Sequence, residues 1–230
     1  MTKATDKIIV ALDVPTNKEA LKLVTELSPD VGFFKIGLQL YTAEGPGLVR
    51  AIPFLGPKVF LDLKLHDIPV TVAKTVQVAG KLGVNMLTIH LSGGAEMIRA
   101  AVDARRNDMS ILGVTVLTSM GDESLQEIGV SERINEHVLR LAQLGVSAGI
   151  DGIVASPFEV QTLRAEFGEK IKIVTPGIRP SWAEPEDQKR FMTPREAMEA
   201  GADYLVIGRP ITADPNPKQA LSKILNEIGT

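Results

Sequence analysis

The chain has 230 residues, of which 44% are hydrophobic, and a formal net charge of −3 at pH 7. This composition suits one large domain or two small ones with a substantial core, and it excludes disorder as the main state. Acidic and basic residues are scattered along the chain, so neither a nucleic-acid surface nor an anionic-membrane surface is expected, and the absence of cysteine excludes disulfides, thiolate catalysis and cysteine-ligated zinc.

The first residues, MTKATDK, lead directly into an apolar, strand-like run and contain no signal segment. No later run approaches the roughly 20 apolar residues that a membrane span requires. We therefore expect a cytoplasmic protein that acts on small molecules, with no nucleic-acid or membrane partner.

Eight short runs rich in β-branched residues predict strands, and stretches with helical spacing lie between them. The helical pattern is clearest over residues 17–28 and 132–145, and the second stretch ends at Gly145, a residue suited to a helix C-terminus. The predicted strands lie at residues 7–13, 31–37, 58–65, 86–92, 111–118, 149–156, 171–177 and 204–210.

Strand followed by helix, eight times over, predicts an α/β protein with a (β/α)8 TIM barrel, and we expect residues 1–230 to form a single catalytic domain. A doubly wound open sheet is the alternative. It is disfavoured because LDVPTNKE, and not a GxGxxG motif, follows the first strand. The polar segment SWAEPEDQKR, residues 181–190, has the character of a mobile lid.

The third predicted strand carries charged residues within the apolar segment FLDLKLHDIPVT. Strand alternation places Asp62 and Lys64 on one face and the neighbouring leucines on the other. Because a barrel covers both strand faces, the charged face must point into its C-terminal mouth. Lys35 on the second strand can reach Asp62, since neighbouring strands lie about 4.8 Å apart. Asp67 follows the strand in a loop that could turn inward or reach a neighbouring subunit.

Lys35, Asp62, Lys64 and Asp67 would form an alternating, formally neutral set of charges that compensates its own burial. Such a set indicates a reaction pocket, and a solvated or purely structural salt-bridge network is the alternative reading. The acids could also bind magnesium together with Asp13, although the lysines compete for them.

Other polar residues are predicted near the strand ends. Asp13 follows the first strand, while His90 and Thr118 lie near the ends of the fourth and fifth; His90 is read as a structural histidine, with a catalytic base as the alternative. TPGIR and VIGRPI, after the seventh and eighth strands, suit a phosphate because glycines admit backbone N–H groups and Arg179 and Arg209 supply donors. The alternative is that these glycines only shape turns.

FLDLKLHDIP with Lys35 upstream, TPGIRP, the DQKR of the lid and GADYLVIGRPIT together resemble the bacterial orotidine 5′-phosphate decarboxylase family over nearly the whole chain. The chain departs from the family pattern at Val70, where asparagine is usual, and valine caps a helix less well. The resemblance implies decarboxylation of orotidine 5′-monophosphate to UMP in pyrimidine synthesis. It also implies a homodimer with shared active sites and neither a metal nor an organic cofactor.

The resemblance further implies a role for each matching residue. Lys64 would donate the proton, with Asp62, Lys35 and Asp67 holding it in place. The other implied substrate-binding residues are Asp13 and Lys35 at the ribose, Thr118 at the pyrimidine, Asp67 and Thr71 from the partner subunit, Arg179, Gln188, Gly208 and Arg209 at the phosphate and lid, and, with no assigned place, Ile68 and Pro176. Two other functions stay open: a magnesium-dependent sugar-phosphate aldolase, and a non-catalytic sensor of nucleotide phosphates.

Overall fold

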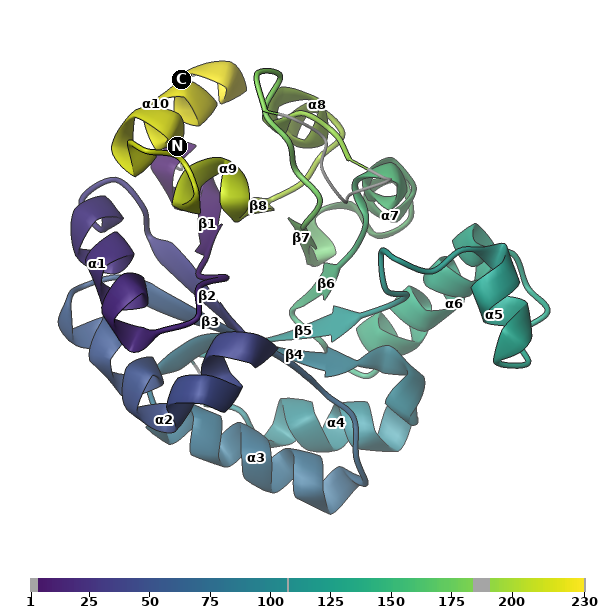
Figure 1. The fold of residues 1–230 in the computed structure, drawn as a ribbon. Coiled ribbons are helices and arrows are strands. Elements are labelled where there is room, and N and C mark those ends of the chain that lie inside the picture. Colours follow the sequence, from purple (N-terminus) through teal and green to yellow (C-terminus); the bar gives the residue numbers. More distant parts are fainter. Residues whose placement is uncertain (1–3, 107, 184–190, 230) are drawn as a thin grey trace.

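The computed structural model describes residues 4–106, 108–183 and 191–229, in which eight parallel strands form a closed barrel in chain order (Figure 1). Strand β8 pairs with β1 in parallel register, with Val206 opposite Ile9, and this pairing closes the barrel. The predicted fold class is therefore confirmed. The strands are β1 (Ile8–Ala11), β2 (Phe33–Gly37), β3 (Lys58–Leu65), β4 (Val84–His90), β5 (Ser110–Val114), β6 (Gly152–Val154), β7 (Lys172–Thr175) and β8 (Tyr204–Ile207).

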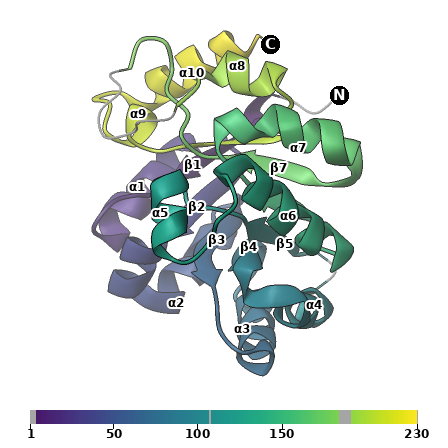
Figure 2. The ribbon, with the colours of Figure 1, turned by 90° about the vertical axis from the view of Figure 1, so that its right-hand side faces the viewer.

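Helices surround the strands on the outside of the barrel (Figures 1 and 2), and α5 lies beyond α6, away from the strands. None of the helices in the described part of the chain is long and apolar enough to cross a membrane. The α-helices are α1 (Asn17–Leu27), α2 (Leu38–Phe54), α3 (Pro69–Lys81), α4 (Gly94–Ala104), α5 (Asp122–Glu127), α6 (Ile134–Ser147), α7 (Val160–Phe167), α8 (Pro194–Glu199), α9 (Arg209–Thr212) and α10 (Pro217–Ile228).

Two sequence predictions need correction. Several strands are shorter than predicted; β5 ends at Val114, so Thr118 lies in the loop after it. Gly145 does not end its helix, because α6 continues to Ser147. A Cβ at Gly145 would meet Ile150 Cδ1 at 2.6 Å, so this glycine serves close packing rather than helix termination.

Apolar side chains form two separate layers. The larger cluster lies between the strands and the helices. A smaller cluster fills the barrel interior with side chains from seven of the eight strands, which is the expected packing for a barrel of this size. The inner cluster consists of Ile9, Ala11, Phe33, Phe60, Met86, Leu112, Val174 and Val206. Residues that continue these inward faces beyond the cluster must therefore reach the mouth of the barrel.

Strand β6 starts at a glycine because two strands approach closely there. A Cβ at Gly152 would lie 2.6 Å from the backbone oxygen of Lys172, which cannot move without disturbing β7. Gly47 in α2 offers a matched control, since it is exposed and a Cβ there meets no atom within 4 Å.

We expect Gly152→Ala to lower the free energy of unfolding by about 1–3 kcal/mol, because the added methyl group overpacks the β6–β7 pairing. Gly47→Ala should leave the free energy of unfolding unchanged or raise it, since alanine favours a helix. Denaturant unfolding of both variants measures the difference. Equal stabilities would contradict this account of the β6–β7 contact.

Candidate active site

A cavity of about 240 Å³ lies at the C-terminal mouth of the barrel. Its wall combines charged side chains from β2, β3 and the segment after β1 with apolar side chains from β1, β3, β5, β6 and β8. The loops that follow β5, β7 and β8 complete it. The lining residues are Ala11, Asp13, Lys35, Phe60, Asp62, Lys64, Val114, Val116, Leu117, Thr118, Val154, Ala155, Pro176, Gly177, Ile178, Arg179, Val206, Gly208 and Arg209.

Four charged side chains form a continuous line along one side of the cavity. Lys35 Nζ lies 3.3 Å from Asp13 Oδ1 and 3.9 Å from Asp62 Oδ2. Lys64 Nζ donates to both carboxylate oxygens of Asp62, each at 2.9 Å. The predicted approach of Lys35 to Asp62 is thus present. Within one chain, however, the fourth member of the set is Asp13 and not Asp67.

Burial decreases from the middle of this line to its ends. The side chains of Lys35 and Asp62 are 11% and 15% exposed, whereas those of Lys64 and Asp13 are 28% and 52% exposed. Two acids and two lysines balance one another, which offsets much of the cost of removing them from water. The outer lysine, Lys64, keeps its ammonium group at the cavity wall, where a ligand can reach it.

Two glycines leave room for Lys35 and Asp13. A Cβ at Gly37 would lie 3.1 Å from Lys35 Nζ, and a Cβ at Gly208 would lie 3.1 Å from Asp13 Oδ2. Each distance is shorter than an ordinary van der Waals contact, so a side chain at either position would displace a charged group. These glycines thus help to fix where Asp13 and Lys35 lie.

The backbone of Lys64 has an unusual conformation. Its φ angle of 52° makes it the one non-glycine residue with positive φ in the described part of the chain. Such a conformation costs a lysine about 1–3 kcal/mol and persists only where surrounding contacts enforce it. Strain of this kind concentrates at functional sites, which agrees with the position of Lys64 at the cavity wall.

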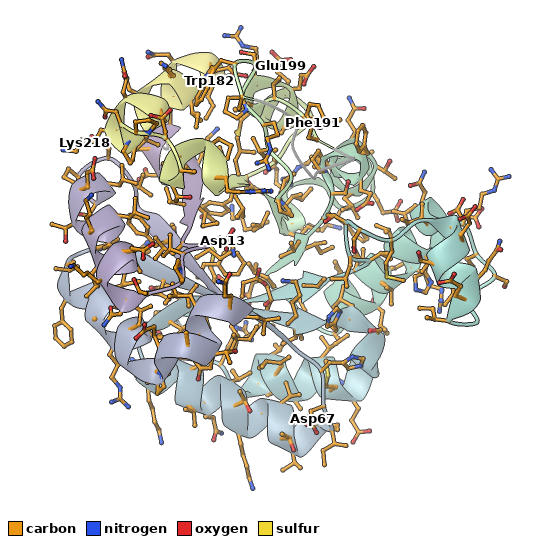
Figure 3. The ribbon with its side chains drawn as sticks, in the orientation of Figure 1. Asp13, Asp67, Trp182, Phe191, Glu199 and Lys218 are labelled. Carbon is orange, nitrogen blue, oxygen red and sulfur yellow. The ribbon has the colours of Figure 1, made fainter. Side chains whose placement is uncertain are left out.

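Asp67, Ile68 and Thr71 lie away from the cavity of their own chain. After β3 the chain turns outward into α3, and Asp67 lies beside that helix while Asp13 lies within the ring of strands (Figure 3). All three residues are exposed, and Asp67 Oδ1 accepts a hydrogen bond from the backbone N–H of Ile68 at 2.6 Å. Helix α3 begins at Pro69 without a side-chain cap, and Val70 lies in its first turn.

The remaining predicted residues reach the same cavity from the loops that follow β5, β7 and β8. Thr118, Pro176, Arg179, Gly208 and Arg209 all line it. Arg179 is 4% exposed, and its backbone N–H donates to the carbonyl oxygen of Met192 at 2.9 Å, which joins the segment after β7 to the segment before α8. Two arginines and two glycine-containing loops therefore border one end of the cavity.

The predicted lid lies largely outside the described residues, and Gln188 is among those that are not described. The described start of the segment packs on α10. Ser181 donates its backbone N–H to Glu227 Oε2 at 3.4 Å, and Lys223 Nζ lies 5.1 Å from the centre of the Trp182 ring.

Thr88 and the apolar wall of the cavity were not identified from the sequence. Thr88 Oγ1 accepts from the backbone N–H of Lys64 at 2.8 Å and donates to Asp62 Oδ1 at 3.0 Å. The sequence signal for Thr88 is its position in MLTIHLS, two residues after Met86, because residues two apart in a strand face the same side. Among the described residues, no three histidine or acidic side chains gather closely enough to hold a metal ion.

His90 ends β4 and its ring lies beside that of His66, with 5.5 Å between ring centres. Burial of the His90 ring is the main cause that lowers its pKa below 6.5. The charges of His66 and Lys64 lower this pKa further, and Asp62 acts in the opposite direction. We therefore expect His90 to be neutral at pH 7.

The chain is similar to proteins of known family along nearly its full length. Residues 6–224 match the family model described as "Orotidine 5'-phosphate decarboxylase / HUMPS family". The orotidine 5′-phosphate decarboxylase of Geotalea daltonii is 49% identical over 232 residues, which cover 98% of this chain and 97% of the relative. The same enzyme of Moorella thermoacetica is 49% identical over 234 residues, covering 98% and 93%.

Solved structures agree with this relationship. The crystal structure of orotidine 5′-phosphate decarboxylase from Lactobacillus acidophilus has a TM-score of 0.86 and 35% identity, and the match covers 98% of this chain and all of the other. The Pyrococcus horikoshii enzyme has a TM-score of 0.79 and 26% identity, with coverage of 97% and 99%.

The lowered pKa of His90 predicts a specific dependence of stability on pH. His90 binds a proton less readily in the folded chain than in the unfolded chain. Its contribution to the free energy of unfolding is therefore fully present above pH 6.5 and is lost as the pH drops below that value. Between pH 7.5 and pH 5.5, the wild-type chain should therefore lose more stability than a His90→Gln variant, which carries no titrating group there. Urea denaturation at the two pH values measures the difference, and an equal loss in both proteins would contradict the prediction.

Proposed function

The chain belongs to the orotidine 5′-phosphate decarboxylase / HUMPS family, and from this membership and the geometry of the cavity we propose that it is a carboxy-lyase that converts orotidine 5′-monophosphate to UMP and CO2 in pyrimidine synthesis. The observation that carries the proposal is the ammonium group of Lys64, which lies at the cavity wall 2.9 Å from both oxygens of Asp62.

Decarboxylation at C6 of the pyrimidine poses a problem of charge. When the bond between C6 and the carboxylate carbon breaks, CO2 leaves and the electron pair stays on C6, where no adjacent group can delocalise it. An enzyme that accelerates so slow a reaction must supply on the order of 20 kcal/mol of differential stabilisation. A single contact cannot supply this amount, so several interactions must act together.

Lys64 can both stabilise the charge on C6 and supply the proton that replaces CO2. Its ammonium group stabilises the negative charge that develops on C6, and it then transfers a proton to that carbon. Asp62 holds the ammonium group in place, while Lys35 and Asp13 complete a line of alternating charge. Apolar side chains of the cavity wall, among them Val114, Val154 and Val206, keep the local dielectric constant low, which strengthens these interactions.

Asp62 contributes a second effect. Its carboxylate lies beside Lys64, close to where the departing carboxylate of the substrate must be when C6 faces the ammonium group. The two negative charges repel each other in the bound substrate, and loss of CO2 removes this repulsion. Such destabilisation of the ground state adds to the stabilisation that Lys64 provides in the transition state.

The far end of the cavity suits the 5′-phosphate. Arg179 and Arg209 supply guanidinium groups, which match phosphate oxygens well, and Gly177 and Gly208 allow close approach of backbone N–H groups. Phosphate binding is remote from C6, so its energy is available to exclude water from the reacting atoms. Asp13 and Lys35, between the two ends, are placed for the ribose, and Thr118 for the pyrimidine.

We propose further that the active enzyme is a homodimer whose sites are shared. Asp67, Ile68 and Thr71 face outward from the chain that carries them, and Ile68, Val70 and Val78 expose apolar side chains on or beside α3. A partner that covers this face would shield these apolar groups from water and receive Asp67 near its own Lys64.

The competing enzyme function is a sugar-phosphate aldolase that requires magnesium, the alternative that the charged motif of β3 leaves open. The relatives with 49% identity carry the decarboxylase name, which favours decarboxylation. A non-catalytic phosphate sensor is a weaker competitor, because it has no use for a lysine in a strained conformation beside an acid. Activity in the presence of a chelator distinguishes the two enzymes.

We expect the wild-type protein to consume orotidine 5′-monophosphate in an absorbance assay, with the same rate in the presence of EDTA. Lys64→Ala should lower kcat by at least about 10⁴-fold, because both the charge and the proton are lost, while the protein still binds UMP. Lys58→Ala, which removes an exposed lysine at the other end of β3, is the matched control and should keep wild-type activity. Near-normal turnover by Lys64→Ala, or loss of wild-type activity with EDTA, would refute the mechanism.

Mixed dimers test the shared site. Lys64→Ala and Asp67→Ala homodimers should each be inactive, since every site lacks one residue. After subunit exchange at a 1:1 ratio, random pairing gives heterodimers with one intact site, and about a quarter of wild-type activity should return. Absence of recovery, with exchange verified by native mass spectrometry, would show that each site is complete within one chain.

A further inference from the structure

Strand β3 contains two residues more than its neighbour at the point where Lys64 lies. Leu61 pairs with Leu87 of β4, and Leu65 pairs with Ile89, so β3 advances four residues while β4 advances two. The register between the strands omits residues 62–64, which form a bulge. The ladder of β4 therefore does not hold the backbone of Lys64 in place.

Thr88 occupies the β4 position opposite this bulge. It is fully buried, and its side chain follows that of Met86 on the inward face of the strand. The hydroxyl group accepts from the backbone N–H of Lys64 at 2.8 Å and donates to Asp62 Oδ1 at 3.0 Å. One hydroxyl group has one proton to donate and lone pairs to accept with, so both bonds form at once.

Both partners of Thr88 belong to the same ion pair. Lys64 Nζ donates to the carboxylate of Asp62. The hydroxyl group of Thr88 binds both the backbone N–H of Lys64 and the carboxylate of Asp62. The hydroxyl group thereby fixes the left-handed backbone of Lys64 and the orientation of the carboxylate with respect to each other. Thr88 itself does not line the cavity, so it acts only through these two residues.

We propose that Thr88 is a positioning residue that sets the geometry of the Lys64–Asp62 pair. The inference rests on the proposed function for its kinetic consequences, but its structural consequence is independent of any activity. Without the hydroxyl group, the N–H of Lys64 loses its partner and the strained backbone relaxes, which moves the ammonium group away from its place at the cavity wall.

The alternative is that Thr88 only fills space in the barrel interior. The two readings make opposite predictions for two substitutions. Thr88→Val keeps the shape of the side chain and removes both hydrogen bonds, whereas Thr88→Ser keeps the hydroxyl group and removes a methyl group. A positioning role makes the valine variant the worse enzyme, and a packing role makes the serine variant the worse one.

The kinetic test uses the full-length protein and measures kcat, KM for orotidine 5′-monophosphate and affinity for UMP. We expect Thr88→Val to lower kcat by about 10²-fold with UMP affinity changed less than about threefold, because misplacement of the lysine affects the transition state more than ground-state binding. Thr88→Ser should recover kcat to within about threefold of the wild type.

Thr115→Val is the matched control. Thr115 is a buried threonine directly after β5 that does not line the cavity, and its hydroxyl group makes no hydrogen bond to the described residues. This variant should keep wild-type kcat. If Thr88→Val does not fold, Thr88→Cys, whose thiol group hydrogen-bonds only weakly, replaces it with the same expectations.

Crystal structures of the wild type and the valine or cysteine variant complete the test. We expect Lys64 to leave its positive φ angle, or its Nζ to move away from Asp62, in the variant alone. Unchanged Lys64 geometry, or a serine variant as impaired in kcat as the valine variant, would overturn the proposal. If the wild type does not decarboxylate orotidine 5′-monophosphate, the proposed function fails, and the geometry of Lys64 in the variant still decides the role of Thr88.

Discussion

The ion pair between Lys64 and Asp62 is the interaction on which the rest of the site depends. A closed parallel barrel leaves no strand face in water, so a charge on an inward face must find an opposite charge. Lys35 and Asp13 extend the pair into a neutral line of four. A cation can therefore be kept at the wall of an apolar cavity, where its field acts strongly on a ligand.

The barrel brings this line together from parts that are distant in sequence. Asp13, Lys35 and the Asp62–Lys64 pair follow or belong to three consecutive strands, whose C-terminal ends meet at one mouth. Strands β5, β6 and β8 supply apolar wall, and β7 and β8 lead into loops with arginine and glycine. The line of four charges and the loops with arginine and glycine thus border one cavity.

Much of this arrangement could be predicted from the sequence. Period-two alternation in FLDLKL identifies the inward face of β3, and the repetition of strand and helix identifies the barrel. The bulge at Lys64 could not be predicted, because alternation assumes a continuous ladder and the pairing with β4 breaks there. Thr88 was missed for the same reason: its role arises from a break in register. Asp67 belongs to a loop, whose direction depends on how α3 packs.

The left-handed backbone of Lys64 has a consequence for how the chain can change over generations. Backbone preference alone favours glycine at position 64, since glycine adopts positive φ without steric cost. A laboratory selection that scored only resistance to heat would favour glycine at this position. Under the proposed function, a selection scored by growth without added uracil would keep lysine. Under the proposed function, lysine at position 64 supplies chemistry at the expense of folding energy.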